Sequence, residues 1–178
     1  MKPTFHAMPI NSPFEDPCVF LRIERERRAL LFDLGNIEKL DFGNALKITD
    51  VFVTHMHMDH FIGFDTLLRT VLKREAPLRI YGPKGIEDCV EGKLKGYAWN
   101  LIADYPVKIE VFGFDEMSIS HSSFHAKNAF RRIDSENIPF KRILFEEPML
   151  KANVAILSHG IPAAAYSIEE DFHININK

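Results

Sequence analysis

The fold is decided by residues 54–60, Thr54-His55-Met56-His57-Met58-Asp59-His60, which place four metal-binding side chains within six positions. An apolar strand is expected before them, over residues 50–53, and apolar residues at spacings of three and four predict a helix over residues 59–74. In an extended strand the two histidines at alternate positions point to the same side. Neighbouring side chains at a helix start diverge by about 100°, so the last two ligands are aimed at a second, nearby point. The stretch therefore predicts a metal site.

These side chains suit zinc. Three imidazoles and a carboxylate are ligands that Zn²⁺ accepts readily, with Mn²⁺ or Fe as other occupants. The alternative is that they are ordinary core residues, as a single histidine in a strand usually is. Burying all four without a metal costs several kcal/mol, so we expect His55, His57, Asp59 and His60 to hold up to two ions. The N-terminus of the helix that follows adds partial positive charge, which favours a bound hydroxide or phosphate.

Composition limits the class of protein. The chain has 178 residues, 46% of them hydrophobic, and a formal net charge of −3. We expect residues 1–178 to form a single domain, with no membrane-spanning segment and no signal peptide. The slightly acidic balance argues against a surface covered in positive charge, although it leaves room for a local basic patch. Cys18 and Cys89 are expected to be reduced core residues of a cytoplasmic protein.

Strands and helices alternate along the chain. Strands are expected over residues 4–9, 18–23, 29–33, 50–53, 78–81, 108–112, 117–121, 153–157 and 164–169. Helices are expected over residues 59–74 and 83–94, with a helical turn over 44–47 and a solvated hairpin turn over 24–28. Residues 122–147 fit either an irregular loop or one edge strand. This order predicts a mixed sheet covered by helices on one face.

The His-x-His-x-Asp-His motif after an apolar strand resembles the signature of the metallo-β-lactamase superfamily, and two further segments extend the likeness. Leu31-Phe32-Asp33-Leu34-Gly35 resembles the first motif of that superfamily, and Leu157-Ser158-His159-Gly160-Ile161-Pro162, followed by Ala165-Tyr166-Ser167-Ile168, resembles a later motif of its ribonuclease Z group. The resemblance implies that Asp33 braces the metal-binding loop without touching the metal, and that His159 is a fifth ligand. It also implies an α+β fold, a metallo-β-lactamase-type mixed β-sheet with covering helices that is half of a four-layer αβ/βα sandwich.

The sequence departs from the family pattern in its metal ligands. Members of the group supply a bridging Asp and a final His later in the chain, and neither Asp171 nor His173 stands in a matching context. We therefore expect the N-terminal half of such an enzyme, which binds about one metal ion well and a second one weakly. A half-fold leaves one sheet face uncovered, so the expected partner is a second copy in a homodimer or the missing C-terminal half.

The resemblance implies a tRNA 3′-processing endoribonuclease that cleaves a phosphodiester bond of precursor tRNA with a metal-bound hydroxide as nucleophile. Asp59 would be the catalytic residue, holding one metal and orienting the nucleophile. Lys127, Arg131 and Arg132 lie near Phe124 and Phe130 and are candidates for contacting RNA. The alternative for these basic residues is a solvated loop with the two phenylalanines in the core.

Two other functions fit the same residues. One is a different metallo-β-lactamase-fold hydrolase, acting on a small phosphodiester, a thioester or a lactone. The other is a catalytically inactive metal-binding fragment that dimerises, which the missing bridging Asp favours. Cleavage of precursor tRNA but not of a chromogenic phosphodiester would separate the first alternative from a ribonuclease Z-like enzyme.

Overall fold

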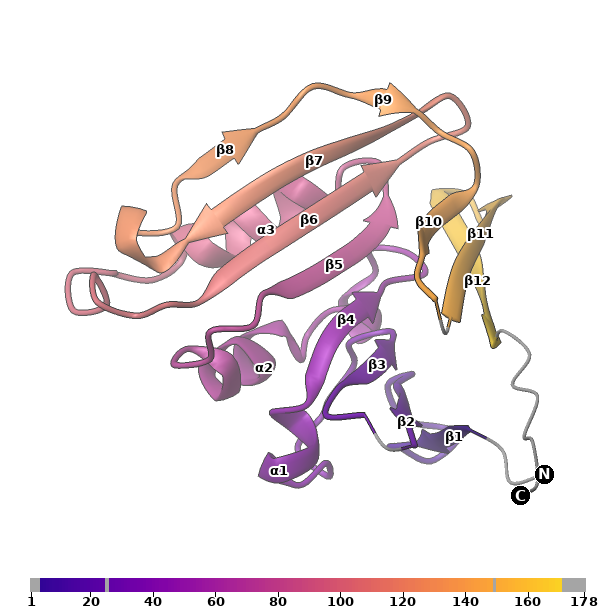
Figure 1. The fold of residues 1–178 in the computed structure, drawn as a ribbon, viewed down its shortest axis with the longest axis horizontal. Coiled ribbons are helices and arrows are strands. Elements are labelled where there is room, and N and C mark those ends of the chain that lie inside the picture. The colour runs from indigo at the N-terminus through magenta and orange to yellow at the C-terminus, as the bar shows by residue number, and fades with distance from the viewer. Residues whose placement is uncertain (1–3, 25, 149, 171–178) are drawn as a thin grey trace, which may run out of the picture.

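The computed structural model describes residues 4–24, 26–148 and 150–170. In these residues the chain forms a large mixed sheet with helices on one face and a smaller antiparallel sheet on the other (Figure 1). The predicted α+β class with a helix-covered mixed sheet is confirmed.

The larger sheet contains nine of the described strands, in the order β1-β2-β3-β4-β5-β6-β7-β8, with β9 also paired to β7. Strands β3 to β6 run parallel, and the strands on either side of them are antiparallel. The bounds are β1 Phe5–Pro9, β2 Val19–Ile23, β3 Ala29–Phe32, β4 Ile48–Phe52, β5 Leu78–Pro83, β6 Lys108–Phe114, β7 Ser118–His125, β8 Arg132–Asp134 and β9 Ile138–Pro139. The central strands are rich in buried apolar residues because a parallel sheet is covered on both faces.

The helices cover one face of this sheet. They are α1 Phe42–Ala45, α2 Phe64–Val71 and α3 Ile86–Lys95, with short 3₁₀ turns η1 Met58–His60 and η2 Ala126–Asn128. Leu67 and Val71 of α2 and Val90 of α3 are fully buried in the cluster that also contains Val51 and Ile80 of the sheet. This cluster is the main core of the chain.

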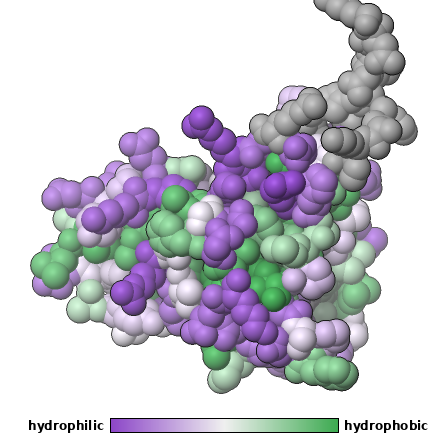
Figure 2. Space-filling view, turned by 90° about the horizontal axis from the view of Figure 1, so that it is seen from below, coloured by the Kyte–Doolittle hydropathy of each residue, from purple (hydrophilic) through white to green (hydrophobic). Residues whose placement is uncertain are grey.

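The second face is covered by β10 Ile143–Glu146, β11 Leu150–Ser158 and β12 Pro162–Glu170, an antiparallel sheet in that order. Its buried Leu150, Val154 and Ala164 pack with Phe52 and Tyr81 of the larger sheet. The expected bare face is therefore partly covered by the chain itself. Figure 2 shows one side of the molecule, where hydrophobic residues lie in several patches separated by hydrophilic ones. Across the described ranges, no helix has the length and apolarity to cross a membrane.

The expected helix over residues 59–74 is wrong at its start. The structure has the 3₁₀ turn η1 at residues 58–60, and the α-helix begins only at Phe64. The reason is a competing backbone connection: Leu34 N–H donates to the His60 carbonyl at 2.9 Å, and Gly63 N–H donates to the Leu34 carbonyl at 2.9 Å. These bonds take groups that a continuous helix would use, so the helix N-terminus does not lie directly beneath Asp59.

For residues 122–147 the sequence allowed either a loop or one edge strand. The structure has several strands in this range instead. Strand β7 continues to His125, and β8, β9 and β10 follow. The second helix begins at Ile86 rather than at 83, because residues up to Pro83 pair with Phe114 of β6. Both cysteines are free, Cys18 buried and Cys89 partly buried against the main core.

Candidate metal centre

The candidate site lies where β4 ends and the chain turns toward α2. His55 and His57 follow this strand directly, with His55 half-buried and His57 exposed. His159 comes from the other sheet, on the tight turn between β11 and β12, where its N–H donates to the Ile161 carbonyl at 3.2 Å. Gly160 in this turn has φ +74°, a left-handed conformation that glycine adopts without strain. Two distant segments thus meet at one point.

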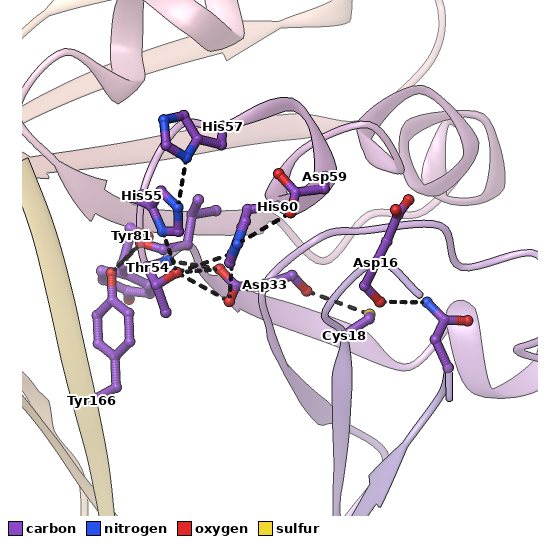
Figure 3. Close-up of polar contacts among 12 residues, drawn as sticks. Asp16, Cys18, Asp33, Thr54, His55, His57, Asp59, His60, Tyr81 and Tyr166 are labelled. Atoms are coloured by element: carbon purple, nitrogen blue, oxygen red, sulfur yellow. Dashed lines mark hydrogen bonds and ion pairs between the residues drawn. The ribbon is translucent and has the colours of Figure 1, made fainter. Parts of the chain in front are cut away.

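The three histidines form a group of metal-binding size. One ring nitrogen from each of His55, His57 and His159 lies within 4.8 Å of the others. His55 Nε2 is 3.0 Å from His57 Nδ1, a contact drawn in Figure 3. Nitrogens that share one zinc lie roughly 3.3 Å apart, because the Zn–N bonds of about 2.0–2.1 Å point to the corners of a tetrahedron. Three imidazole nitrogens this close together could therefore hold a divalent metal ion.

Asp59 and His60 lie beside this group rather than in it. The Nδ1 atom of His60 is 2.9 Å from Asp33 Oδ2, and its Nε2 atom is 3.6 Å from Asp59 Oδ2. The His60 ring centroid is 3.9 Å from that of His55. Within the described part of the chain, these two side chains are not joined by a third metal-binding residue in a group of this size. Their role as ligands of a second metal ion therefore stays a prediction.

Asp33 is the brace of the site. Its carboxylate is 7% exposed and accepts hydrogen bonds from the Thr54 amide at 2.7 Å and from the Thr54 hydroxyl at 2.9 Å (Figure 3). Asp33 has φ 54°, in the left-handed region that Asp tolerates better than most residues. The carboxylate thereby holds Thr54, the first residue of the histidine loop.

The Thr54 hydroxyl also orients two imidazoles. Its oxygen is 3.0 Å from His55 Nδ1 and 3.1 Å from His60 Nδ1. A hydroxyl has one proton to donate, and the Asp33 carboxylate can only accept it. With that proton directed at Asp33, the oxygen is left to accept from His55 Nδ1, so that Nδ1 carries the proton of this ring and Nε2 presents a lone pair. This is the tautomer needed for ligation through Nε2.

Burial and neighbouring charges favour the ligating forms. Burial lowers the pKa of His55, and the nearby His60 and His57 lower it further, which favours the neutral imidazole that binds metals. On the facing sheet, burial raises the pKa of Tyr166 well above its ordinary value, and the Asp33 charge adds to this effect. Tyr166 therefore remains a hydrogen-bond donor.

The basic residues proposed to contact RNA are at a different place. Lys127, Arg131 and Arg132 follow the end of β7, where His125 is paired with Lys108 at the start of β6. The histidines lie at the opposite end of the parallel strands, near β10–β12 (Figure 1).

Arg132 is already neutralised. It contacts Asp88 at 2.6 Å and Asp134 at 2.5 Å, while Lys127 and Arg131 are exposed. The structure therefore does not bring the basic segment into the site, and its role in RNA binding stays a prediction.

Two contributors to the site were not assigned roles from the sequence. In the sequence Thr54 is only the residue before the histidines, and Tyr166 is only part of a later motif. The contact of the Tyr166 hydroxyl with Val53 spans 113 residues. A periodic pattern carries no signal for a contact at such a separation.

The comparisons agree with this geometry. No protein-family model matches the sequence. Ribonuclease Z of Enterococcus faecalis is 31% identical over 162 residues, which are 87% of this chain and 43% of that protein. The solved structure of human tRNase Z, short form, matches with a TM-score of 0.54 at 23% identity, over 94% of this chain and 64% of that one.

A second solved structure identifies the fold. A metallo-β-lactamase fold protein from Bacillus subtilis has a TM-score of 0.52 at 16% identity, over 93% of this chain and 54% of that one. The chain spans about half the length of the curated relatives it matches. The chain therefore has a metallo-β-lactamase fold and is similar in sequence to about half the length of relatives named ribonuclease Z.

Proposed function

We propose that this chain carries the metal-binding part of a metal-dependent phosphodiester hydrolase of the ribonuclease Z type. The observation that carries the proposal is the meeting of His55, His57 and His159 within 4.8 Å. An antiparallel hairpin and a loop after a parallel strand bring these rings together from positions about a hundred residues apart in sequence. Three histidines with one further position for water or substrate are a known ligand set of catalytic zinc.

Each residue of the site has a task in this proposal. A divalent metal ion, when bound, lowers the pKa of water and stabilises negative charge on phosphoryl oxygens. His55, His57 and His159 hold the ion, and Asp33 with Thr54 fixes the tautomer of His55. Asp59, whose side chain is 54% exposed beside His60, would help to hold a second ion and orient the attacking group.

The proposed substrate is the 3′ end of a precursor tRNA, on the strength of relatives named ribonuclease Z and tRNase Z. We propose zinc as the metal, with one ion held well and a second one weakly at Asp59 and His60. A second copy of the chain or a complementary half would complete that second position. The proposal includes a single domain in the cytoplasm with reduced Cys18 and Cys89.

Zinc binding tests the metal site directly. The chain is titrated with zinc in competition with a chromophoric chelator, together with His159→Ala and the control His6→Ala, which removes a partly exposed histidine on β1. We expect about one tight zinc per chain, a loss of at least about a hundredfold in affinity for His159→Ala, and no change for His6→Ala. Equal zinc affinity in wild type and His159→Ala would overturn the proposal.

Activity tests the substrate class. The chain is incubated with precursor tRNA in the presence of zinc or manganese. Cleavage at the 3′ trailer by wild type, and loss of this cleavage in Asp59→Ala, would support the ribonuclease Z-like function. Cleavage of only a chromogenic phosphodiester would assign a small-molecule hydrolase. Tight zinc binding with no hydrolysis of either substrate would identify a metal-binding fragment without activity, which the unpaired second ligand set would explain.

A further inference from the structure

The three histidines come from two separate sheets, so something must fix the distance between those sheets. His55 and His57 belong to the loop after β4, and His159 belongs to the turn of the β11–β12 hairpin. Apolar packing between the sheets is non-directional. Ligation needs nitrogen positions defined to a fraction of an ångström. The contacts between β12 and the end of β4 therefore decide whether His159 is within reach.

Two hydrogen bonds connect β12 to the histidine loop. The Ala164 N–H donates to the Thr54 carbonyl at 2.8 Å. The Tyr166 hydroxyl donates to the Val53 carbonyl at 2.6 Å and lies 3.4 Å from the Tyr81 carbonyl. In Figure 3 the Tyr166 side chain extends from its strand toward the residues around Thr54 and His55.

The acceptors are at a rigid point of the molecule. Val53 N–H donates to the Tyr81 carbonyl at 2.8 Å, which ties the ends of β4 and β5 together. The next residue, Thr54, is held by the Asp33 carboxylate. A phenol that binds Val53 is therefore linked, through two peptide units, to the backbone of His55.

The donor is on a strand that continues into the His159 turn. Tyr166 pairs with Val154 of β11, and the ladder runs without interruption to the pair Ser158–Pro162 beside the turn. The Tyr166 ring packs in the cluster between the sheets, 5.3 Å from the Phe52 ring. Because the hairpin between Tyr166 and the turn is regular, fixing the Tyr166 hydroxyl also fixes where His159 lies.

We propose that Tyr166 is a positioning residue for the three-histidine site: its hydroxyl, bound to the Val53 carbonyl, sets the hairpin at the distance that brings His159 to His55 and His57. This inference rests on the proposed metal site. The competing explanation is that the hydroxyl only satisfies a buried acceptor. In that case its removal lowers stability and leaves zinc affinity unchanged.

Tyr166→Phe removes the hydroxyl and keeps the ring. The matched control is Ile168→Val, a change in the same strand and the same cluster that lowers stability and keeps the hydroxyl. Zinc affinity is measured for both under conditions in which circular dichroism shows them folded. We expect Tyr166→Phe to bind zinc about 10- to 100-fold more weakly, the effect typical of groups that orient ligands, and Ile168→Val to stay within about twofold of wild type. Equal affinities in the two variants would overturn the proposal.

A measurement without metal separates this proposal from the metal site itself. The Ala164 amide, bound to the Thr54 carbonyl, reports the contact between hairpin and loop by hydrogen exchange. We expect its exchange to be at least about tenfold faster in Tyr166→Phe than in Ile168→Val. Unchanged exchange would overturn the positioning role even if zinc binds. A wild-type chain that binds no zinc would overturn the proposed function, and the exchange data would still decide whether Tyr166 sets the hairpin.

Discussion

Two buried aspartates on neighbouring strands have opposite surroundings. Asp50, in β4, is fully buried and contacts Arg79 at 2.7 Å and the Thr49 hydroxyl at 2.6 Å. Asp33, at the end of β3, is bound by the Thr54 amide and hydroxyl and by His60. A permanent guanidinium charge thus neutralises Asp50, whereas the partners of Asp33 are neutral groups and an imidazole.

The difference indicates that Asp50 stabilises the fold, whereas Asp33 organises the histidine site. The Asp50 pair belongs to a network in which Arg79 lies 3.9 Å from Glu147, and Glu147 contacts Arg28 at 2.6 Å, so it joins the larger sheet to the β10–β11 connection. All of its charges are matched within the fold. The side chains that bind Asp33 also contact the residues of the histidine site: the Thr54 hydroxyl contacts His55, and the second ring nitrogen of His60 faces Asp59. A buried carboxylate without a permanent counter-charge is costly, which is the arrangement expected where a cation binds nearby.

The largest effect is expected when Asp50 loses its charge. Asp50→Asn leaves the Arg79 guanidinium, whose side chain is 28% exposed, without its partner. We expect a loss of about 3 kcal/mol in the free energy of unfolding, measured by urea denaturation, with zinc affinity of the folded protein unchanged. A loss below about 1 kcal/mol, the range of exposed ion pairs, would contradict the assigned structural role.

A glycine pair tests the backbone connection beneath Asp33. A Cβ at Gly63 would clash with the Gly35 carbonyl, whereas a Cβ at Gly92 in α3 meets open space. We expect Gly63→Ala to lower the free energy of unfolding by about 2 kcal/mol. Gly92→Ala should raise it by about 0.5–1 kcal/mol, because alanine favours a helix interior. Thermal denaturation measures both, and a Gly63→Ala variant as stable as wild type would show that the close approach of the two loops is not rigid.

Asp33→Asn separates the brace from the structural aspartate. Asn keeps the shape and tolerates the left-handed φ, but it removes the charge that orients Thr54 and His60. We expect zinc affinity to fall by about tenfold, which is about 1.4 kcal/mol, by chelator competition. The stability loss without metal should be smaller than for Asp50→Asn. If Asp33→Asn lowered stability more than Asp50→Asn, or if Asp50→Asn lowered zinc affinity more than Asp33→Asn, the two aspartates would not have the separate roles assigned to them.

The sequence predicted the features that depend on residues close together in the chain. It missed the contacts between residues far apart in the chain. Strand β4 and the histidines after it could be predicted because the apolar strand pattern and the histidine motif lie within about ten residues of each other. Asp33 was identified through its Asp-x-Gly context. Asp50 was interpreted only as the start of a strand, because Arg79 lies 29 residues further along and Glu147 later still. Arg28 was expected in a solvated turn, but its side chain is 17% exposed and bound to Glu147.

The late helix start was missed for the same kind of reason. Apolar spacing continues smoothly from Phe61 to Leu72, so periodicity alone extends the helix to Asp59. The bonds from Leu34 to His60 and from Gly63 to Leu34 interrupt it, and both depend on how two loops meet. The small antiparallel sheet over residues 143–170 likewise follows from packing against the aromatic face of the larger sheet.

Asp115 gives the smallest expected effect and tests whether a surface carboxylate behaves like either buried one. It caps the β6–β7 turn, where hydrogen bonds from the Met117 amide, the Lys84 ammonium and the Ser118 amide lower its pKa from 3.8 to about 2. A lowered folded-state pKa stabilises the fold above the unfolded value, and this contribution is lost as the pH falls through the folded value.

We therefore expect Asp115→Asn to lower the free energy of unfolding at pH 7 by about 0.5–1 kcal/mol, a surface-scale effect. The gap to wild type should shrink as the pH falls from 3.8 to about 2. Urea denaturation across this range measures it, with Glu116→Gln, a change to an exposed acid in the same turn, as the control. A gap that persists at pH 2 would mean that the carboxylate stabilises the turn by its shape rather than its charge. Asp115 would then differ from both buried aspartates, for which we expect removal of the charge to have an effect.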